Sequence, residues 1–127
     1  MTIDRIQSSH GSYSESAAVV GPGRWIHVAG QLGADPDGTG IEDPLGVQAE
    51  RAFRRLAAAL EAHGATLDHI VSMTTYVTGF DDWPQLVEVR SKLFADALPA
   101  STAIQVSGLI GGAAVEIDAV AFVGDEG

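Results

Sequence analysis

The sequence lacks cysteine and holds few basic residues. With no cysteine among 127 residues, disulfide bonds, thiolate zinc sites and cysteine nucleophiles are excluded. Seven lysines and arginines stand against seventeen acidic residues, which gives a net charge of −10. Because binding to a phosphate backbone needs a positively charged surface, nucleic acid is not an expected partner.

Long apolar runs are also missing. No stretch of the sequence approaches the roughly 20 apolar residues that cross a bilayer, and residues 1–12 lack the basic start and apolar middle of a signal peptide. We therefore expect no membrane partner and a cytoplasmic location. The four histidines show neither helical i,i+4 pairing nor close carboxylate neighbours, so no metal site is expected.

The chain is long enough for one core. Hydrophobic residues make up 46% of it, which predicts a single domain over residues 1–127 of the α/β or α+β class. Asp43 as N-cap and Pro44 at the first helical position predict a helix that ends at Gly64. Its core stripe is predicted to contain Ala49, Ala52, Phe53, Leu56, Leu60 and His63. A second helix is expected after Asp82, running to about Asp96.

Alternating and β-branched segments predict the strands. They are residues 2–9, 17–20, 25–29, 70–78, 101–107 and 115–122. Gly21-Pro22-Gly23 lies between the second and third of these, and indicates that they form a hairpin. Two helices against one sheet leave its other face uncovered, which indicates oligomerisation.

The segment Val115 to Phe122 carries the first candidate for function. One of its faces is apolar, and the other begins with Glu116 and Asp118. A carboxylate on such an interior strand is costly to bury unless it is partnered, hydrated or protonated. Glu116 is therefore a candidate functional residue, and the alternative is a carboxylate held by backbone groups of a neighbouring subunit.

Two further positions precede the first helix. Tyr13 lies in a polar, Gly/Ser-rich loop, where it either packs over the sheet or lines a pocket. Gly30 follows an apolar strand and would allow another backbone or a ligand to come close.

Several short motifs follow one another in a distinctive order. They are V-A-G-Q at 28–31, A-H-G-A-T-L-D-H-I-V at 62–71, T-T-Y-V-T at 74–78, F-x-x-x-L-P-A-S-T-A from Phe94, and V-E-I-D-A-V-A at 115–121. In these segments the chain resembles the reactive-intermediate imine deaminase family, also called the RidA or YjgF family. The resemblance covers nearly the whole chain from Tyr13 onward. It implies a chorismate-mutase-like α+β fold, with two helices on one face of a mixed sheet, and a homotrimer whose sheets face inward.

The resemblance also implies a chemistry. Members hydrolyse 2-imino acids to 2-keto acids and ammonia without a cofactor, in clefts between subunits that bind a small molecule. Glu116 matches the family glutamate that holds the attacking water, which makes it the expected catalytic residue. Tyr13, Gly30, Ser101 and Thr102 are the expected substrate-binding residues.

Two positions depart from the family pattern, and one is Val87, where the archetype's second helix has an asparagine. Ser101 stands where the archetype has an arginine that binds the substrate carboxylate, and a hydroxyl cannot imitate a bidentate guanidinium. Efficient deamination of 2-iminopropionate is therefore not expected unless Arg24 or Arg90 supplies the charge. Two functions stay open. One is hydrolysis of an imine, enamine or other small C–N substrate that lacks a carboxylate at the archetype's position, and the other is a non-catalytic trimer that binds a small metabolite or a protein.

Overall fold

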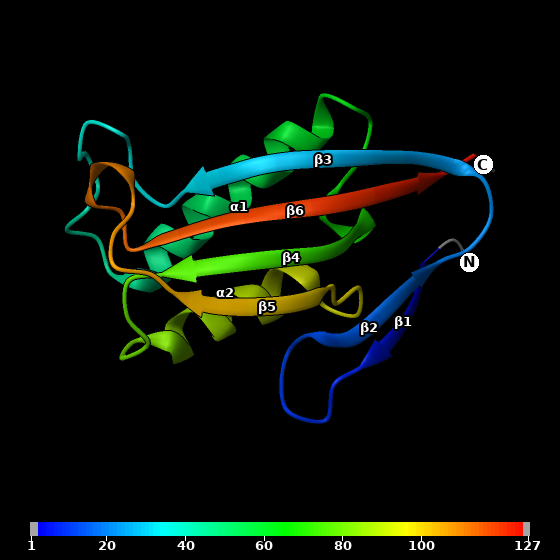
Figure 1. Ribbon diagram of the computed structural model, residues 1–127, viewed down its shortest axis with the longest axis horizontal. Helices are drawn as coiled ribbons and strands as arrows, with labels where there is room; N and C mark the ends of the chain where they lie inside the picture. The colour runs from blue at the N-terminus through cyan, green and yellow to red at the C-terminus, as the bar shows by residue number, and fades with distance from the viewer. Residues whose placement is uncertain (1–2, 126–127) are drawn as a thin grey trace.

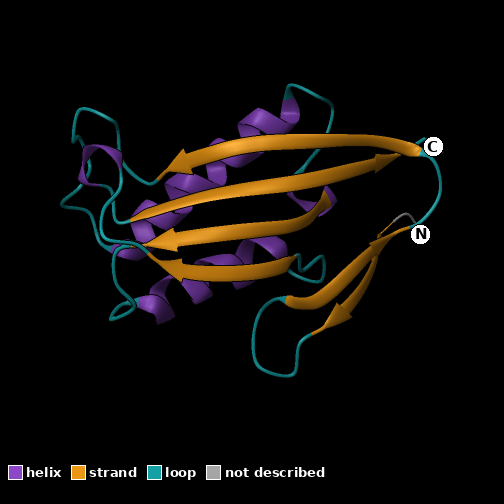
Figure 2. Ribbon diagram, in the orientation of Figure 1, coloured by secondary structure: helices purple, strands orange, loops and turns teal. Residues whose placement is uncertain are grey.

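Six strands form one mixed sheet in the computed structural model, which describes residues 3–125 (Figure 1). The strands are β1 (Ile3–Gln7), β2 (Ser14–Val19), β3 (Gly23–Leu32), β4 (Ile70–Val77), β5 (Ala100–Gln105) and β6 (Val115–Gly124). Their spatial order is β1-β2-β5-β4-β6-β3. Helices α1 (Leu45–Glu61) and α2 (Trp83–Phe94) lie on one face, so the predicted α+β class and layer arrangement are confirmed (Figure 2).

The core lies between that face and the two helices. The α1 residues Phe53, Leu56 and Leu60 are fully buried, as the helical stripe predicted. Burial of each such side chain contributes roughly 1.5–3 kcal/mol to folding. Phe53 meets Phe94 of α2 edge to face, with ring centroids 5.5 Å apart. Ile117 of β6 packs into the same core, so the face of β6 that carries Ile117 is the one covered by the helices.

The helix ends differ in part from the prediction. Asp43 is not the N-cap of α1, because Pro44 takes that position and the helix begins at Leu45. The Asp43 carboxylate instead pairs with Arg51 at 2.7 Å. His63 lies beyond the helix and is exposed, so its place in the core stripe was wrong. Within residues 3–125, neither helix combines the length and hydropathy that a membrane crossing requires.

The predicted hairpin between residues 17–20 and 25–29 is also wrong. β2 pairs with β1 and meets β5 at Ser14 and Ala100, whereas β3 pairs with β6. Three hydrogen bonds hold the β1–β2 pair beside the start of β5. The Ser14 amide donates to the Pro99 carbonyl at 2.8 Å, and the Leu98 carbonyl accepts from Ser14 Oγ at 2.5 Å and from Arg5 Nη1 at 3.0 Å. A small apolar cluster of Ile3, Val71 and Phe122 adds to them.

The second face of the four-stranded part β5-β4-β6-β3 carries no helix (Figure 2). We call it the open face. Trp25 of β3 is 52% exposed there and contacts Phe122 of β6, with ring centroids 5.0 Å apart. Ile104 of β5 is 43% exposed on the same face. Large apolar side chains therefore remain accessible on this side of the chain.

Candidate functional site

Glu116 lies on the open face near the beginning of β6. It is flanked by Leu32 of β3 and Tyr76 of β4 in the strand register. The next residue, Ile117, is fully buried beneath the helices. Because successive residues of a strand point to opposite faces, the Glu116 side chain points to the open side, where it is half-buried.

Gly30 lies directly beside the Glu116 carboxylate. A Cβ atom at position 30 would be 2.4 Å from Glu116 Oε2 and 2.9 Å from its Cδ, so the missing side chain leaves the space that the carboxylate occupies. A bulge between Val28 and Gln31 places Gly30 outside the regular pairing. The structure thus brings together two of the residues that the sequence singled out.

The nearby hydrogen-bond donors donate to Asp118 rather than to Glu116. Tyr76 Oη donates to Asp118 Oδ2 at 3.2 Å, and the Thr74 amide lies 3.3 Å from Asp118 Oδ1. Among residues 3–125, Glu116 forms no ion pair. Its carboxylate oxygens are therefore available to a water molecule or a ligand.

The Asp118 contact also affects the Tyr76 phenol. The negative charge of Asp118 raises the pKa of Tyr76 above its ordinary value, with smaller contributions from lost hydration, the Asp118 hydrogen bond and Glu116; a hydrogen bond with Thr74 opposes them. Tyr76 thus stays a neutral donor across the physiological pH range.

Arg90 organises a second group of candidate residues on the helix side of the sheet. Its Nε and Nη2 each donate to Ser12 Oγ at 3.2 Å, and Nη1 donates to Ser101 Oγ at 3.3 Å. The guanidinium carbon lies 5.8 Å from the centroid of the Tyr13 ring and 5.7 Å from that of Trp83. We call Arg90, Ser12, Tyr13, Trp83 and Ser101 the Arg90 cluster.

Arg90 as a whole residue is 4% exposed. Burial lowers the pKa of its guanidinium, and Tyr13 opposes that shift. A guanidinium remains protonated at neutral pH even so. The cluster therefore carries one full positive charge beneath the surface.

The two groups lie on opposite faces of the sheet. Ser101 is opposite Met73, which points into the helix-covered core, whereas Glu116 is opposite Tyr76 on the open face. Glu116 and Ser101 of one chain therefore do not face each other. Thr102 does share the open face, but β4 separates it from β6, a gap of at least about 10 Å at ordinary strand spacing.

Sequence reasoning found Arg90 only as a distant possibility and missed Gln48. Gln48 is 1% exposed; its Nε2 donates to the Asp43 carbonyl at 3.1 Å, and its Oε1 accepts from the Ala114 amide at 2.9 Å. It thereby fixes the chain just before β6. A signal for Arg90 was present, because Leu86, Arg90 and Phe94 follow one another at i,i+4 spacing on the buried side of α2.

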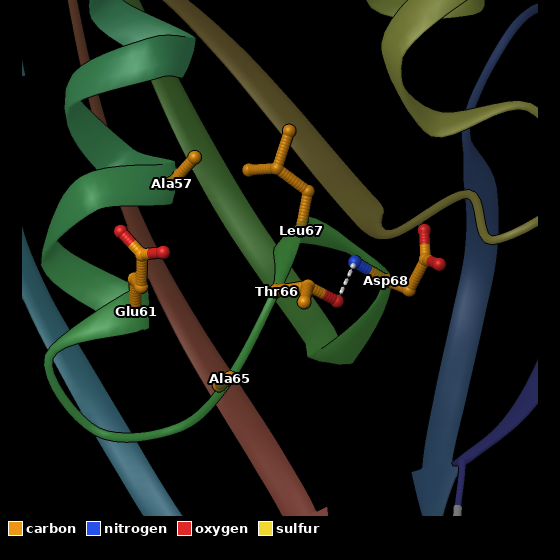
Figure 3. Close-up of a pocket in the computed structure, with 6 residues that line it drawn as sticks. All are labelled: Ala57, Glu61, Ala65, Thr66, Leu67 and Asp68. Atoms are coloured by element: carbon orange, nitrogen blue, oxygen red, sulfur yellow. Dashed lines mark hydrogen bonds between the residues drawn. The ribbon is translucent and has the colours of Figure 1, made fainter.

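Other features of the surface do not involve these residues. An open hollow of about 400 Å³ lies between the end of α1 and the turn that precedes β4. Figure 3 shows the residues that line it. They are Ala57, Glu61, Ala65, Thr66, Leu67 and Asp68. Arg24 lies at the start of β3, where its guanidinium approaches Gly64 rather than Ser101. Within residues 3–125, no group of three metal-ligating side chains comes together.

Comparison with known proteins identifies the family. A family model described as Endoribonuclease L-PSP matches residues 2–123. A 2-iminobutanoate/2-iminopropanoate deaminase from Mus musculus is 34% identical over 116 residues, which is 90% of this chain and 83% of the mouse protein. The chain belongs to the RidA family.

Other RidA relatives agree over similar lengths. A RutC family protein from Pyrococcus abyssi is 34% identical over 113 residues, covering 88% of this chain and 87% of its own length. The crystal structure of RidA from a Psychrobacter species is 31% identical, with a TM-score of 0.72, and the match covers 97% of this chain and 99% of that one. The similarity to these relatives therefore extends over most of the chain.

Proposed function

We propose that this RidA-family chain hydrolyses small imines or enamines, with Glu116 as the residue that holds and deprotonates the attacking water. The observation that carries the proposal is the Glu116 carboxylate: half-buried, seated against Gly30 and without an ion-pair partner in residues 3–125. A carboxylate held in this way can accept a proton from water as the water attacks. The names of the mouse and other mammalian relatives support the reaction class.

The reaction balances with water as the only co-reactant. The substrate reacts as the iminium ion, with its nitrogen protonated. The water oxygen adds to the iminium carbon while Glu116 accepts one water proton, and this gives a neutral carbinolamine. Glu116 then returns that proton to nitrogen, and the C–N bond breaks as the carbinolamine hydroxyl gives its proton to Glu116. The carbonyl compound and ammonia are released, and ammonia takes up the proton from Glu116. An enamine first tautomerises to the imine, so no cofactor takes part.

We place the reaction in a cleft between copies of the chain, in a homotrimer. Trp25 and Ile104 support this assembly, because both are large apolar side chains left accessible on the open face. The Arg90 cluster and Glu116 lie on opposite faces of one chain. A ligand in contact with both would therefore have Glu116 from one copy and Ser101 from another. Tyr13, Gly30 and Thr102 complete the proposed binding residues.

Turnover of 2-iminopropanoate should be slow if Ser101 alone receives its carboxylate. Losing a charged partner of a bound carboxylate costs about 2–5 kcal/mol, and position 101 carries a hydroxyl. The same observation favours a second function, a non-catalytic trimer that binds a metabolite or protein in this cleft. RNA cleavage, which the family model's description suggests, is not proposed, because the chain has a net charge of −10.

A panel of imines and enamines tests the proposal. Each is generated in the assay, with and without a carboxylate, and its hydrolysis is followed with wild-type protein, the Glu116→Ala variant and buffer. We expect rates above buffer for at least one substrate and loss of that rate in Glu116→Ala. A panel without any rate above buffer, combined with specific binding of a metabolite, would support the non-catalytic function instead. The cytoplasmic location and the trimer remain predictions that fractionation and sedimentation can test.

A further inference from the structure

Arg90 is buried without a carboxylate partner in residues 3–125, which no other cation of that range combines. Arg5 and Arg24 also form no ion pair there, but Arg5 is half-buried and Arg24 is exposed. Arg51, Arg54, Arg55 and Lys92 each lie within 4.0 Å of a carboxylate. Arg90 is the only charged side chain in residues 3–125 that is buried, and no carboxylate of that range pairs with it. With seventeen acidic residues in the sequence, a partner was readily available. Burying a charge without one is costly, so a function that uses the free charge gives a reason for the arrangement.

The geometry of the Arg90 cluster keeps that charge usable. The Tyr13 and Trp83 rings lie near the guanidinium, and cation–π contacts of this kind partly compensate a buried cation. The guanidinium has five N–H groups, and three of them donate to Ser12 and Ser101. Two N–H groups have no acceptor among the described residues.

The serine hydroxyls are oriented by the same contacts. Each hydroxyl oxygen accepts from Arg90, so its own hydrogen must point away from the guanidinium. Ser101 is half-buried at the edge of the helix-covered layer, with the cation 3.3 Å behind its oxygen. A hydroxyl whose hydrogen points away from a positive charge behind its oxygen is a donor suited to an anion.

We propose that Ser101, backed by Arg90 and Ser12, forms a subsite for the carboxylate of a small ligand. Arg90 acts here as a positioning residue, because its charge reaches the ligand mainly through the Ser101 hydroxyl. In this chain the positive charge of the subsite comes from position 90 on α2, whereas in the family archetype it comes from the arginine at the position of Ser101 on β5. That the ligand is a 2-imino acid or its 2-keto product rests on the proposed function. The preference of the subsite for an anion does not.

A structural role is the competing explanation. Arg90 could serve only to clamp the loop that holds Ser12 and Tyr13 against α2 and β5. A clamp would affect all ligands of the cleft alike, whereas a charged subsite discriminates between a carboxylate and a neutral analogue of the same shape. This difference defines the test.

The test measures binding of 2-oxobutanoate and 2-oxobutanamide to the intact protein by ligand-observed NMR and calorimetry. We expect wild-type protein to bind the carboxylate at least tenfold more tightly than the amide. Arg90→Gln should reduce this ratio to about one with amide binding unchanged, and Arg90→Lys should restore it to within threefold of wild type. Arg54→Gln is the matched control: it also removes one positive charge, from an exposed pair with Glu50, and should leave the ratio unchanged.

Two outcomes would overturn the subsite. One is a wild-type protein that binds the carboxylate no better than the amide or binds neither, and the other is an Arg90→Gln variant that weakens both ligands equally. If Arg90→Gln does not fold, Ser101→Ala gives the same information, since it should lower the carboxylate ratio at least threefold and leave Arg90 in place. Glu116→Gln separates the two proposals: it should abolish hydrolysis and leave the carboxylate preference within twofold. A preference without any hydrolysis in the wild-type protein would refute the proposed function alone.

Discussion

Substitution of Gly30 by alanine tests how closely the Glu116 carboxylate depends on the missing side chain. The new Cβ would lie 2.4 Å from Glu116 Oε2, where ordinary contact begins near 3.4 Å. The carboxylate, at the end of a flexible side chain, must therefore move by roughly 1 Å. A displacement of that size in a reacting group costs about 100-fold in rate. We expect Gly30→Ala to lower kcat/KM by about that factor with little change in the free energy of unfolding.

Two other glycines serve as controls for Gly30. At Gly33 a Cβ would lie 2.7 Å from Gln48 Cβ and from Val115 Cγ1, both in the packed interior. Overpacking of this kind costs about 1–3 kcal/mol, so Gly33→Ala should lower the melting temperature. At Gly108 nothing lies within 4 Å, and Gly108→Ala should change neither property. Normal hydrolysis by Gly30→Ala, or a loss of rate that only follows a loss of folded protein, would refute the role given to Glu116.

Two further predictions concern stability and titration. Thr75 Oγ1 is buried without a hydrogen-bond partner in residues 3–125, so Thr75→Val should raise the free energy of unfolding by about 1 kcal/mol; a lower midpoint of chemical denaturation would contradict this. Since the pKa of Tyr76 is raised in the folded chain, its contribution to stability is fully present below the unfolded value of about 10 and is lost as pH rises through the folded value. A pH titration followed by absorbance at 295 nm should show the ionisation of two phenols in wild-type protein. Tyr76→Phe should remove the ionisation whose pKa lies above about 10. Removal of an ionisation with a pKa at or below that value would contradict the prediction.

Much of the fold could be predicted because its signals are local. The apolar stripe through Phe53 and Leu60 predicted helix α1, and the alternation of apolar and polar residues predicted that strand β6 begins at Val115. The pairing of β2 could not be predicted in the same way. Gly21 and Pro22 permit a turn but do not require the strands beside it to pair, and Ser14 and Arg5 make their contacts with residues far along the chain.

The candidate residues follow the same division. Alternation shows that Ser101 and Thr102 point to opposite faces, but only tertiary packing decides which of them points toward α2. Glu116 was accessible to sequence reasoning because a carboxylate in an apolar strand is conspicuous. Arg90 was harder to predict, because the sequence does not distinguish a buried arginine from an exposed one until the neighbouring residues are known.

Hydrolysis of one imine by the Glu116→Gln variant tests the central claim most directly. The substitution keeps the shape of the side chain and removes its ability to accept a proton. With 2-iminobutanoate generated in the assay, we expect wild-type protein to exceed the buffer rate and Glu116→Gln to fall by about 100-fold or more, with an unchanged melting temperature and oligomeric state. A variant that hydrolyses the imine as fast as wild-type protein would contradict the account.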